Sequence, residues 1–600
     1  MTRPTGGHVR PRGAGELGPG LILVLFGLAG TASTSLWLGG KLAATLTGHR
    51  EVEGPAWSLL LPITLAKHGG LMAAWPGVSS GAVCGCSALV FILLIGSVGG
   101  VGLWVWRHRP TSTARTRSMA KPAELVALRR RAAAVRAARL RPSLARQRPA
   151  ALAMSDCGVT LGRHLPGHAL LLSSWEDVIL AIFAPRSGKT SAVAIPAVLN
   201  APGAVVATSN KADLYLATAR LREQDTGERV WVFDPQGIAH VRQEWWWNPL
   251  GSAMTLDDAE RLAGSFVLTV ADDQQREIWG PAARELLANL FLAGHLAGKT
   301  VPDAYAWLFD EQAAVPVEVL RAHGEPAAAD SLDGMQALHP ETRGSVYFTA
   351  RAATASLRDR QISSWVTRQS GSVEFDARAF VESRQSLYLM SKGIRGGTTA
   401  ASLVAALTNE VRVAAERASE RNGGRLDPPM LLVLDEVANI CRIADLPEQY
   451  SHLGSRSIVP IAILQSYAQG ERVWGRAGMR ELWGAASIKL IGSGADDADF
   501  AEDVSRIIGD HEINTVSIST GHGGRSQSTA TRRERILSAA ELRALPKNRA
   551  VLLATGIRPA LIELLPWYQG KRAKQIDAAM SDGSRELQGR AAAAAVGTRR

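Results

Sequence analysis

The chain is long, basic and poor in cysteine: it has 600 residues, a net charge of +12 and a sequence pI of about 9.8. This length exceeds that of a single domain and predicts two or three, and the charge favours acidic neighbours such as nucleic acid or anionic lipid. The four cysteines show neither metal-ligand spacing nor a disulfide framework, which argues against a zinc module or a disulfide-rich secreted fold and fits a reducing cytosolic interior.

Two apolar runs near the N-terminus predict a membrane anchor over residues 1–106. The first run, Leu17 to Gly40, contains no charged residue and is long enough to cross a hydrocarbon core of about 30 Å. A cleaved signal peptide is the alternative for this run, because basic residues precede it. The second run, Gly81 to Trp106, is similar in length and also uncharged, and it ends on tryptophans as at a membrane interface. The second run therefore favours a two-span anchor over a signal peptide.

A densely basic segment follows the second run. Residues Arg107 to Arg148 contain a single acid, Glu124, whereas the loop Lys41 to Ser80 between the two runs is only lightly charged. The positive-inside rule then places both termini in the cytoplasm, so we expect a multi-pass protein of the cytoplasmic (inner) membrane with a large cytoplasmic body. We interpret residues 107–150 as a basic juxtamembrane linker that contacts lipid head groups or water rather than DNA.

The stretch Val178 to Ser191 has the pattern of a strand, a phosphate loop and a helix. Backbone N–H groups of such a loop point at phosphate oxygens, the ammonium of Lys189 can neutralise the β- and γ-phosphates, and the Thr190 hydroxyl can bind Mg²⁺. Phe183 stands in place of the first glycine of the consensus G-x-x-x-x-G-K-[ST]. We predict that ATP binds to the loop residues Ala184, Pro185, Arg186, Ser187, Gly188, Lys189, Thr190 and Ser191.

The rest of the chain alternates between strand and helix patterns, which predicts a mostly parallel sheet. We expect an α/β fold, a RecA-like P-loop NTPase whose nucleotide-binding domain has two parts, residues 151–254 and 371–567. Residues 255–370 show helical periodicity with few strand signals, and we interpret them as an inserted all-α domain. Three tryptophans, Trp245 to Trp247, precede this domain and fit core packing or a membrane-facing patch better than base stacking. The polar, alanine-rich residues 568–600 are expected to form a disordered tail.

The second half of the chain supplies the acidic partner of the phosphate loop. The apolar run Pro429 to Leu434 ends on Asp435 and Glu436, as expected for a buried parallel strand with acids at its carboxyl end. Ligands of doubly wound sheets bind at that edge. We predict that Asp435 holds Mg²⁺ through water and that Glu436 orients or deprotonates the attacking water. Together with Lys189 these acids indicate ATP hydrolysis.

Two polar residues near the following strand are further catalytic candidates. Gln465 follows the apolar run Ile458 to Leu464, which places it beside the γ-phosphate, where RecA-like motors keep a nucleotide sensor. Arg456 precedes the same run at the edge of the sheet, from where it could reach the nucleotide of a neighbouring subunit as a finger in trans. A surface arginine without a catalytic role is the alternative, and Arg442 and Arg472 are rival fingers.

The order of these motifs resembles that of the type IV secretion coupling proteins, the conjugative DNA transfer ATPases of bacteria. The similarity covers about Val178 to Trp567 together with the N-terminal anchor. It is carried by the two apolar runs and by four motifs in this order: Ala184-Pro185-Arg186-Ser187-Gly188-Lys189-Thr190, Trp247-Asn248-Pro249-Leu250, Leu434-Asp435-Glu436-Val437-Ala438-Asn439 and Ile463-Leu464-Gln465-Ser466.

This resemblance implies a RecA-like homo-hexamer whose all-α domain faces the cytoplasm, with ATP and Mg²⁺ as cofactors. The implied partners are single-stranded DNA, a relaxase with other relaxosome proteins, components of the type IV secretion channel, and the membrane. We therefore expect a membrane-anchored ATPase that couples a relaxase–DNA substrate to the channel and powers the transfer of single-stranded DNA.

Two other functions share part of this pattern. A division-type double-stranded DNA translocase has the same motor and anchor, but such motors usually end in a DNA-reading winged-helix module. The segment after Trp567 is too short and too low in complexity for such a module. A non-hydrolysing membrane receptor that binds nucleotide for assembly is the second alternative. The intact set of Lys189, Thr190, Asp435 and Glu436 argues against it.

Overall fold

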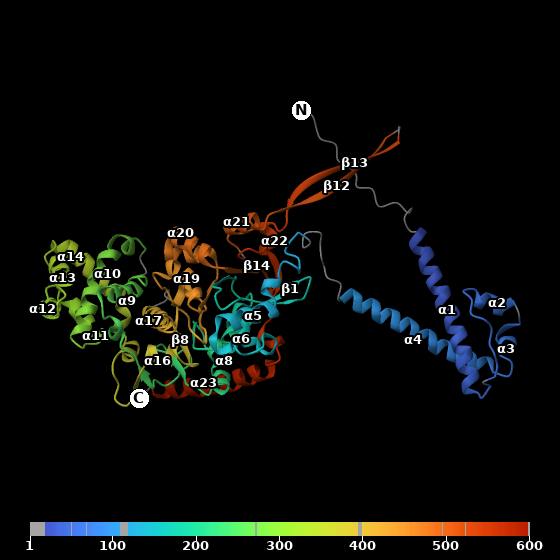
Figure 1. Cartoon of the computed structure of the whole chain (residues 1–600), viewed down its shortest axis with the longest axis horizontal. Helices are drawn as coiled ribbons and strands as arrows, with labels where there is room; N and C mark the ends of the chain where they lie inside the picture. Colours follow the sequence, from blue (N-terminus) through green and yellow to red (C-terminus); the bar gives the residue numbers. More distant parts are fainter. Residues whose placement is uncertain are drawn as a thin grey trace. The chain divides into compact units, whose positions relative to one another are not determined.

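The chain forms two compact units, Met1–Thr111 and Ser112–Arg600. The computed structural model describes residues 18–49, 51–67, 69–107, 118–270, 273–393, 399–494, 496–521 and 524–597. The described part of the first unit is helical (Figure 1), with helices α1 (Gly18–Leu46), α2 (Leu61–Lys67), α3 (Gly70–Ala74) and α4 (Ser80–Arg107).

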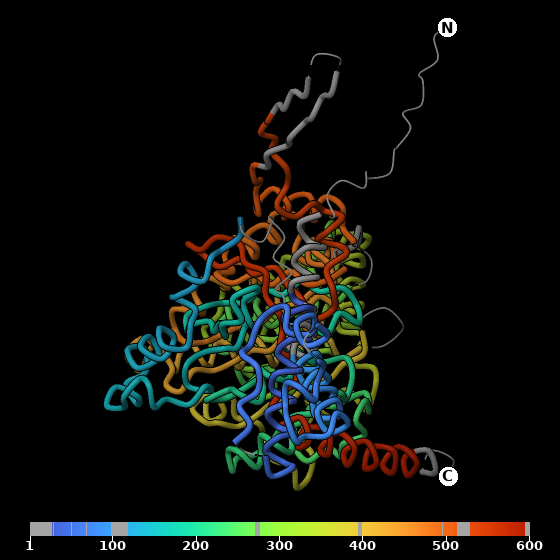
Figure 2. Tube along the Cα trace, turned by 90° about the vertical axis from the view of Figure 1, so that its right-hand side faces the viewer, coloured from blue at the N-terminus to red at the C-terminus, as the bar shows by residue number. Residues whose placement is uncertain are grey.

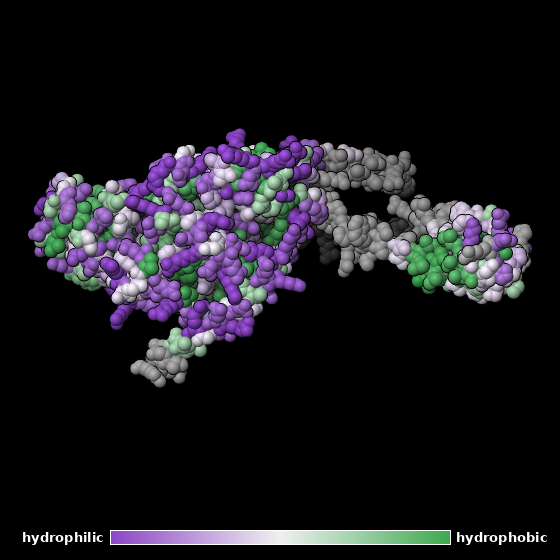
Figure 3. Space-filling view, turned by 60° about the horizontal axis from the view of Figure 1, so that its bottom comes forward, coloured by the Kyte–Doolittle hydropathy of each residue, from purple (hydrophilic) through white to green (hydrophobic). Residues whose placement is uncertain are grey.

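Helices of the first unit approach one another closely at two glycines of α1. A Cβ atom on Gly39 would lie 2.4 Å from the Oγ of Ser87 on α4, and one on Gly40 would lie 2.2 Å from the ring of Trp75. Among the described residues, one helical stretch, Ser80–Ser97, is long and apolar enough to cross a membrane, and Figure 3 shows a hydrophobic surface on this unit. The first predicted span coincides with α1, whose N-terminal side chains lie outside the described residues. The two-span anchor therefore stays a prediction.

The second unit is an α/β fold built on one large mixed sheet. Its eleven strands lie in the order β2-β1-β15-β14-β11-β3-β10-β9-β4-β8-β5. The strands from β11 to β5 in this order are parallel, whereas β14, β15, β1 and β2 pair with their neighbours in antiparallel fashion. The strands are β1 (Thr160–Leu165), β2 (Leu170–Leu172), β3 (Ile179–Ile182), β4 (Val205–Ser209), β5 (Val230–Phe233), β8 (Ser386–Met390), β9 (Met430–Leu434), β10 (Ile458–Leu464), β11 (Ile488–Gly492), β14 (Arg549–Ala554) and β15 (Ala560–Glu563).

Successive side chains of the central strands point to opposite faces of the sheet, so the hydrophobic core has two layers. On β3, Ile179 and Ala181 belong to one hydrophobic cluster, and Leu180 and Ile182 belong to the other. All residues of β3, β9 and β10 are buried, which explains why these strands read as continuous apolar runs. The first cluster packs against α5 (Arg130–Leu140), α7 (Ile195–Leu199) and α8 (Asp213–Thr226), and the second packs against α17 (Ala401–Arg421), α19 (Leu446–Ser455) and α20 (Tyr467–Ala485).

A helical segment lies between two short strands, β6 (Trp245–Trp246) and β7 (Val373–Glu374). These strands pair in parallel, which brings the two ends of the segment together. Trp245, Trp246 and Trp247 are all buried, so the tryptophans belong to the core, one of the two predicted placements. The longer helices of the segment, green in Figure 1, are α9 (Leu256–Val267), α10 (Asp273–Leu296), α11 (Val301–Ala306), α12 (Ala314–Ala322), α13 (Pro326–Gln336) and α14 (Pro340–Ala353).

The C-terminal segment forms a long helix, α23 (Ala573–Gly597), so the predicted disordered tail is wrong for these residues. The helix packs against α8, where Arg220 pairs with Asp582 at 3.3 Å and Asp225 with Arg572 at 2.6 Å. Ile576 and Ala579 are buried on one face of the helix. The high alanine content of the tail hides this narrow apolar face in the sequence.

The basic segment before the sheet is also folded, in contrast to the linker predicted for residues 107–150. Helix α5 buries Ala133, Ala134, Ala137 and Leu140 against the rest of the second unit, while Arg130, Arg131 and Arg139 are exposed. The buried Arg141 donates to Asp427 at 3.0 Å and to Asp156 at 2.8 Å. Residues 118–150 therefore belong to the second unit, and residues 108–117 lie outside the described part of the chain.

A long hairpin leaves the second unit beyond the last parallel strand (Figures 1 and 2). Its strands, β12 (Asp510–Gly521) and β13 (Gly524–Arg535), pair in antiparallel register. Helices α21 (Ala498–Ile508) and α22 (Ala539–Arg543) precede and follow the hairpin in the chain. The shorter helices of this unit include α6 (Met154–Cys157), α15 (Arg360–Ser363), α16 (Ala377–Val381) and α18 (Val437–Ile440).

Candidate nucleotide-binding site

The predicted phosphate loop joins β3 to a helix that starts at Lys189 and ends at Leu199. Arg186 and Gly188 adopt left-handed backbone conformations, with φ of +63° and +95°. The first helical turn, Thr190–Ala194, is a wide π-type turn. Pro196 in the next turn has no N–H, and its ring would crowd the carbonyl four residues earlier, which accounts for the widening. The sequence thus forms the strand–loop–helix arrangement that a phosphate site requires.

The eight predicted loop residues differ in what they offer a ligand. Pro185 and Arg186 are exposed, whereas Ser187 and Lys189 are buried. Two hydroxyls fold the loop onto itself, because Ser187 Oγ donates to the carbonyl of Ala184 at 2.5 Å and Ser191 Oγ donates to that of Gly188 at 3.0 Å. Of the side chains in the loop, those of Lys189 and Thr190 reach the acidic strand end.

Phe183, the departure from the consensus, is accommodated by a glycine on the neighbouring strand. Its ring is buried against Gly492 of β11, where a Cβ atom would lie 2.1 Å from the ring. Its backbone N–H donates to the carbonyl of Leu464 at 3.0 Å, so strand pairing continues into the loop. The phenylalanine therefore changes the core packing beside β3 and leaves the Lys–Thr end of the loop intact.

Strand order brings the two halves of the motif together. Strand β10 lies between β3 and β9, and all three are parallel, so their carboxyl ends meet at one edge of the sheet. At this edge Lys189 Nζ contacts Glu436 Oε1 and lies 3.3 Å from Asp435 Oδ1. Thr190 Oγ1 donates to Asp435 Oδ2 at 2.7 Å. The lysine and both carboxylates are less than a tenth exposed, so these charges interact away from bulk water.

Gln465 lies at the same edge of the sheet, and its role as a nucleotide sensor stays a prediction. Its Nε2 donates to Glu436 Oε1 at 2.5 Å. The other carboxylate oxygen of Glu436 accepts from Asn439 Nδ2 at 2.6 Å, and Gln469 Nε2 donates to Asn439 Oδ1 at 2.8 Å. Glu436 itself has a left-handed backbone with φ of +61°, a conformation that is costly for a residue with a side chain. This network holds the carboxylate of Glu436 in one orientation.

Asn439 and Gln469 were not among the predicted site residues. Asn439 lies three residues after Glu436, and Gln469 lies four residues after Gln465. Each offset corresponds to about one helical turn, so a polar residue at these spacings returns toward the same edge of the sheet. That periodicity is the sequence signal that could have identified them.

The two carboxylates of the site have opposite pKa shifts. Burial raises the pKa of Asp435, and the nearby ammonium of Lys189 does not fully offset this effect. Burial also acts to raise the pKa of Glu436, but Lys189 and the hydrogen bonds from Gln465 and Asn439 outweigh it, so that pKa is lowered. Glu436 is therefore held as a carboxylate by the same lysine that a phosphate would attract.

The oxygens at this edge fit a magnesium ion that is shared with phosphates. Asp435 Oδ1 is buried and pairs with Lys189 Nζ at 3.3 Å without an aligned hydrogen bond from the described residues, and the hydroxyl of Thr190 lies beside the other oxygen. Mg²⁺ in nucleotide sites is commonly held by one or two protein oxygens, with water and substrate phosphates as the remaining ligands. Within the described ranges no group of three or more His, Cys, Asp or Glu side chains could hold a metal by itself. The pair of Thr190 and Asp435 thus suits the shared mode of binding.

Comparison with known protein families identifies the family to which the chain belongs. The family model for type IV secretory system conjugative DNA transfer matches residues 176–588, a range that contains the phosphate loop, the acidic strand end and Gln465. The chain belongs to this family. The match confirms the resemblance to type IV secretion coupling proteins that the motif order indicated.

Several solved structures were also similar to this member of the family. The unbound monoclinic form of the bacterial conjugative coupling protein TrwB is 17% identical with a TM-score of 0.49, over 67% of this chain and 88% of that one. A TrwB complex with ADP and Mg²⁺ is 18% identical with a TM-score of 0.47, over 65% and 85% of the two chains. VirB4 of Thermoanaerobacter pseudethanolicus is 14% identical with a TM-score of 0.43, over 70% and 98%. A comparison with curated proteins gave no match.

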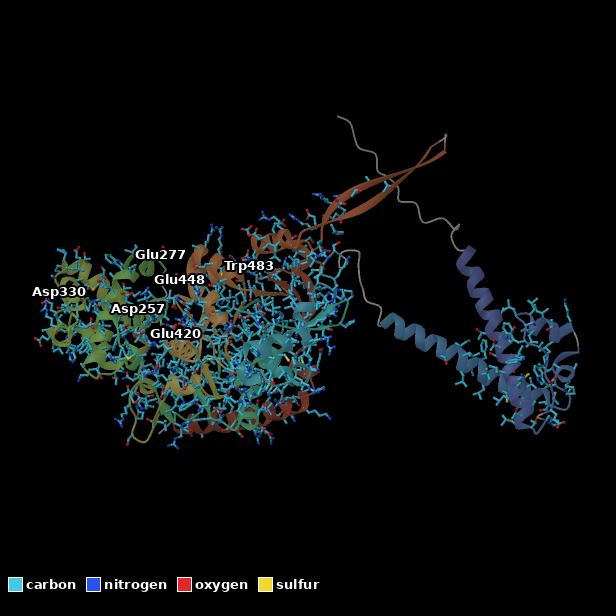
Figure 4. All side chains as sticks on the ribbon, in the orientation of Figure 1. Asp257, Glu277, Asp330, Glu420, Glu448 and Trp483 are labelled. Carbon is cyan, nitrogen blue, oxygen red and sulfur yellow. The ribbon has the colours of Figure 1, made fainter. Side chains whose placement is uncertain are left out.

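Arg456 lies away from the phosphate loop of its own subunit. It precedes β10, and Ser457 and the seven residues of that strand separate it from Gln465, so it lies at the opposite edge of the sheet. Its Nη1 pairs at 2.6 Å with Oε1 of Glu420, which is labelled in Figure 4. Of the rival arginines, Arg442 donates to the carbonyls of Ala438 and Leu268, and Arg472 is exposed on α20. The trans role of Arg456 stays a prediction.

Proposed function

We propose that this family member is a membrane-anchored ATPase that couples a relaxase–DNA substrate to a type IV secretion channel and powers the transfer of single-stranded DNA. One observation carries the proposal. Lys189, Thr190, Asp435, Glu436 and Gln465 meet at one sheet edge in a chain whose motor region matches conjugative DNA transfer. This set contains the parts that phosphoryl transfer from ATP requires: a phosphate loop, a site for Mg²⁺ and a base for water.

In the proposed reaction the phosphates of ATP lie along residues 184–191, and Lys189 exchanges its carboxylate contacts for phosphate oxygens. The loss of this ammonium raises the pKa of Glu436 toward its ordinary value, because the lysine is the main group that lowers it. Glu436 then becomes a better acceptor for a proton from the attacking water, while Gln465 and Asn439 keep its oxygens in place. Mg²⁺ at Thr190 and Asp435 would supply the charge that neutralises the phosphate oxygens.

Two features support the placement in the cytoplasmic membrane with the large C-terminal body inside, and a cytoplasmic N-terminus rests on the predicted first span. Ser80–Ser97 is long and apolar enough to span a membrane, and the basic residues Arg107 to Arg148 follow it. The RecA-like homo-hexamer, the relaxase and the channel components are carried over from the family resemblance. The parallel arrangement of β3, β10 and β9 supports the RecA-like assignment, since it puts one strand between the phosphate loop and the acidic strand.

Measurement of ATP turnover and DNA transfer tests the proposal. Lys189→Ala should abolish ATP hydrolysis and transfer while membrane insertion remains, because its charge acts on the phosphates. Glu436→Gln should bind ATP with near-normal affinity but hydrolyse it at least about 10²-fold more slowly, as expected for the loss of a general base. Normal turnover in either variant would rule out the motor. If the wild type hydrolyses ATP but both variants still transfer DNA normally, ATP hydrolysis by this protein does not power DNA transfer.

A further inference from the structure

The antiparallel part of the sheet delivers two further segments to the nucleotide edge. Strand β14 is antiparallel to β11 with Gly492 opposite Ala550, so β14 starts where β11 ends. Strand β15 is antiparallel to β14 with Arg549 opposite Glu563, so β15 ends at the same edge. Asn548 immediately precedes β14, and the helical turn Trp567–Gln569 follows β15. Both segments therefore lie beside the phosphate loop although neither belongs to a nucleotide-binding motif.

The carboxamide of Asn548 lies against the loop. Its Oδ1 is 3.0 Å from the position that a Cβ atom on Gly188 would occupy, which is a second reason for glycine at that position. This oxygen is buried and has no hydrogen-bond partner among the described residues. The Nδ2 atom donates to the hydroxyl of Tyr568 at 3.3 Å, so the amide is held with its free acceptor toward the loop. A buried acceptor without a donor is unfavourable and is satisfied when a ligand supplies one.

The turn after β15 presents aromatic surface next to the same helix. Tyr568 is 46% exposed, and its ring meets that of Trp567 edge to face at 5.7 Å. The turn packs against the first turn of the phosphate-loop helix, Thr190–Ala194. A cavity of about 360 Å³, lined by Trp567 and by Ala192 and Pro196 of that helix, opens between them. Trp567 lines this cavity and Tyr568 does not, so the exposed ring of Tyr568 lies next to the cavity through its contact with Trp567. An exposed tyrosine ring is the kind of surface on which a nucleobase stacks.

We propose that Asn548 and the Trp567–Tyr568 pair bind the nucleoside part of the nucleotide whose phosphates lie at the loop, an inference that rests on the proposed function. The base stacks on the exposed ring of Tyr568, beside the cavity that Trp567 lines. Asn548 Oδ1 accepts a hydrogen bond from a ribose hydroxyl, a donor that phosphates cannot supply at neutral pH. The site then recognises nucleoside triphosphates rather than polyphosphate alone.

Equilibrium binding of two probes to the full-length protein in detergent tests this inference: MgATP and magnesium tripolyphosphate, which lacks the nucleoside. Tyr568→Ala should weaken MgATP binding about tenfold or more, the equivalent of one stacking contact, and leave tripolyphosphate binding unchanged. Tyr568→Phe keeps the ring and should retain most of the affinity. Asn548→Ala should reduce the preference of the protein for ATP over tripolyphosphate by several-fold and leave tripolyphosphate binding unchanged.

Two outcomes would overturn the inference: unchanged MgATP affinity in Tyr568→Ala and Asn548→Ala, or an equal loss for both probes, which indicates a disturbed loop. Failure of the proposed function has a different signature. In that case the wild-type protein binds neither probe, or Lys189→Ala binds both as well as the wild type does.

Discussion

At the scale of single residues, Phe183 and Gly492 illustrate how a departure from a motif is tolerated. The ring of Phe183 fills the space above Gly492, so the pair forms one packing unit across β3 and β11. Phe183 in place of the consensus glycine changes the core packing beside the loop, whereas Lys189 and Thr190 at the phosphate end are unchanged. Gly492, which is distant in the sequence, thus provides the space for the phenylalanine that replaces the consensus glycine.

Gly492→Ala should therefore disturb the loop indirectly. Its Cβ would lie 2.1 Å from the Phe183 ring, so the ring must move, and we expect a loss of about 1–3 kcal/mol in unfolding free energy together with weaker ATP binding. Adding Phe183→Ala removes the clash and should restore part of the ATP binding, but not the stability, because deletion of a buried ring itself costs about 3–5 kcal/mol. Gly484→Ala is the control, because a Cβ there has no neighbour within 4 Å. Thermal unfolding and ATP binding measure the effect, and wild-type behaviour of Gly492→Ala would show that the contact is unimportant.

At the scale of secondary-structure elements, helix α17 carries a carboxyl group with a shifted pKa. Glu410 is half-buried beside a cavity of about 730 Å³, and its Oε2 accepts from Trp247 Nε1 and Ser252 Oγ, both at 2.8 Å. Burial raises the pKa of Glu410 from 4.5 to about 7, and the two hydrogen bonds only partly oppose this. The folded state therefore favours the protonated carboxyl on balance, because burial outweighs the two accepted hydrogen bonds, which by themselves favour the carboxylate.

Stability should therefore fall as pH rises between about 4.5 and 7, since the unfolded chain loses this proton at lower pH than the folded one. Glu410→Gln keeps an acceptor for Trp247 and stays neutral. Its melting temperature should match that of the wild type near pH 5 and exceed it near pH 8. Exposed Glu481 on α20 supplies the control variant, Glu481→Gln. If the difference in melting temperature between the wild type and Glu410→Gln is the same near pH 5 and near pH 8, the expected pH dependence is wrong.

The C-terminal helix α23 offers a test of its own docking. A Cβ on Gly583 would lie 2.8 Å from Leu216 of α8, whereas one on Gly589 has no neighbour within 4 Å. Gly583→Leu should cost about 1–3 kcal/mol at this contact and make the helix sensitive to protease. Gly589→Leu should be neutral or slightly stabilising, because leucine is the better helix former. Equal protease resistance of the two variants would show that the helix is not held at Gly583.

At the scale of the whole molecule, reporter fusions decide the topology. Reporters at the N-terminus and near Pro149 should be active in the cytoplasm, and one near Gly70 should be active outside, because the strongest basic cluster follows the second apolar run. If Ser80–Ser97 were the single span, the N-terminal reporter would instead report outside. A reporter near Gly70 in the cytoplasm would contradict the two-span anchor.

Ring assembly can be tested through Arg456. Its ion pair with Glu420 is largely exposed, with side-chain exposures of 32% and 61%, and such pairs contribute about 0–1 kcal/mol, so the arginine can exchange partners. If it acts in trans, Arg456→Ala should lower ATPase activity by about 10³-fold, as for established fingers. Mixing Arg456→Ala with Lys189→Ala subunits should restore part of the activity, since some interfaces then contain both intact halves.

Glu420→Gln is the matched control for that experiment and should hydrolyse ATP normally. Normal hydrolysis by Arg456→Ala, or rescue that occurs only with Arg442→Ala or Arg472→Ala, would assign the finger elsewhere. The mixing experiment also tests whether the protein assembles, because activity can be restored only if two subunits contribute residues to one ATP site.

Local patterns alone were sufficient to place the phosphate loop, the acidic strand end and Gln465 at one sheet edge, whereas the catalytic and binding roles of these residues stay predictions. Each is a short contiguous motif, and parallel strands bring their carboxyl ends to one edge wherever they lie in the chain. For Trp245 to Trp247 the sequence favoured core packing or a membrane-facing patch, and the burial of all three rings decides for the core.

Other features depend on contacts between residues far apart in the chain, and no local pattern encodes those contacts. Gly492 accommodates Phe183, and Asn548 covers Gly188, only because the antiparallel strands return to the nucleotide edge. The basic segment and the alanine-rich tail were misassigned for a related reason: a narrow apolar face becomes stabilising once a neighbouring surface is present to bury it. The sequence motifs therefore determine which residues can carry the chemistry of the site. The tertiary structure decides which residues surround them, because the antiparallel strands β14 and β15 bring distant segments to the nucleotide edge.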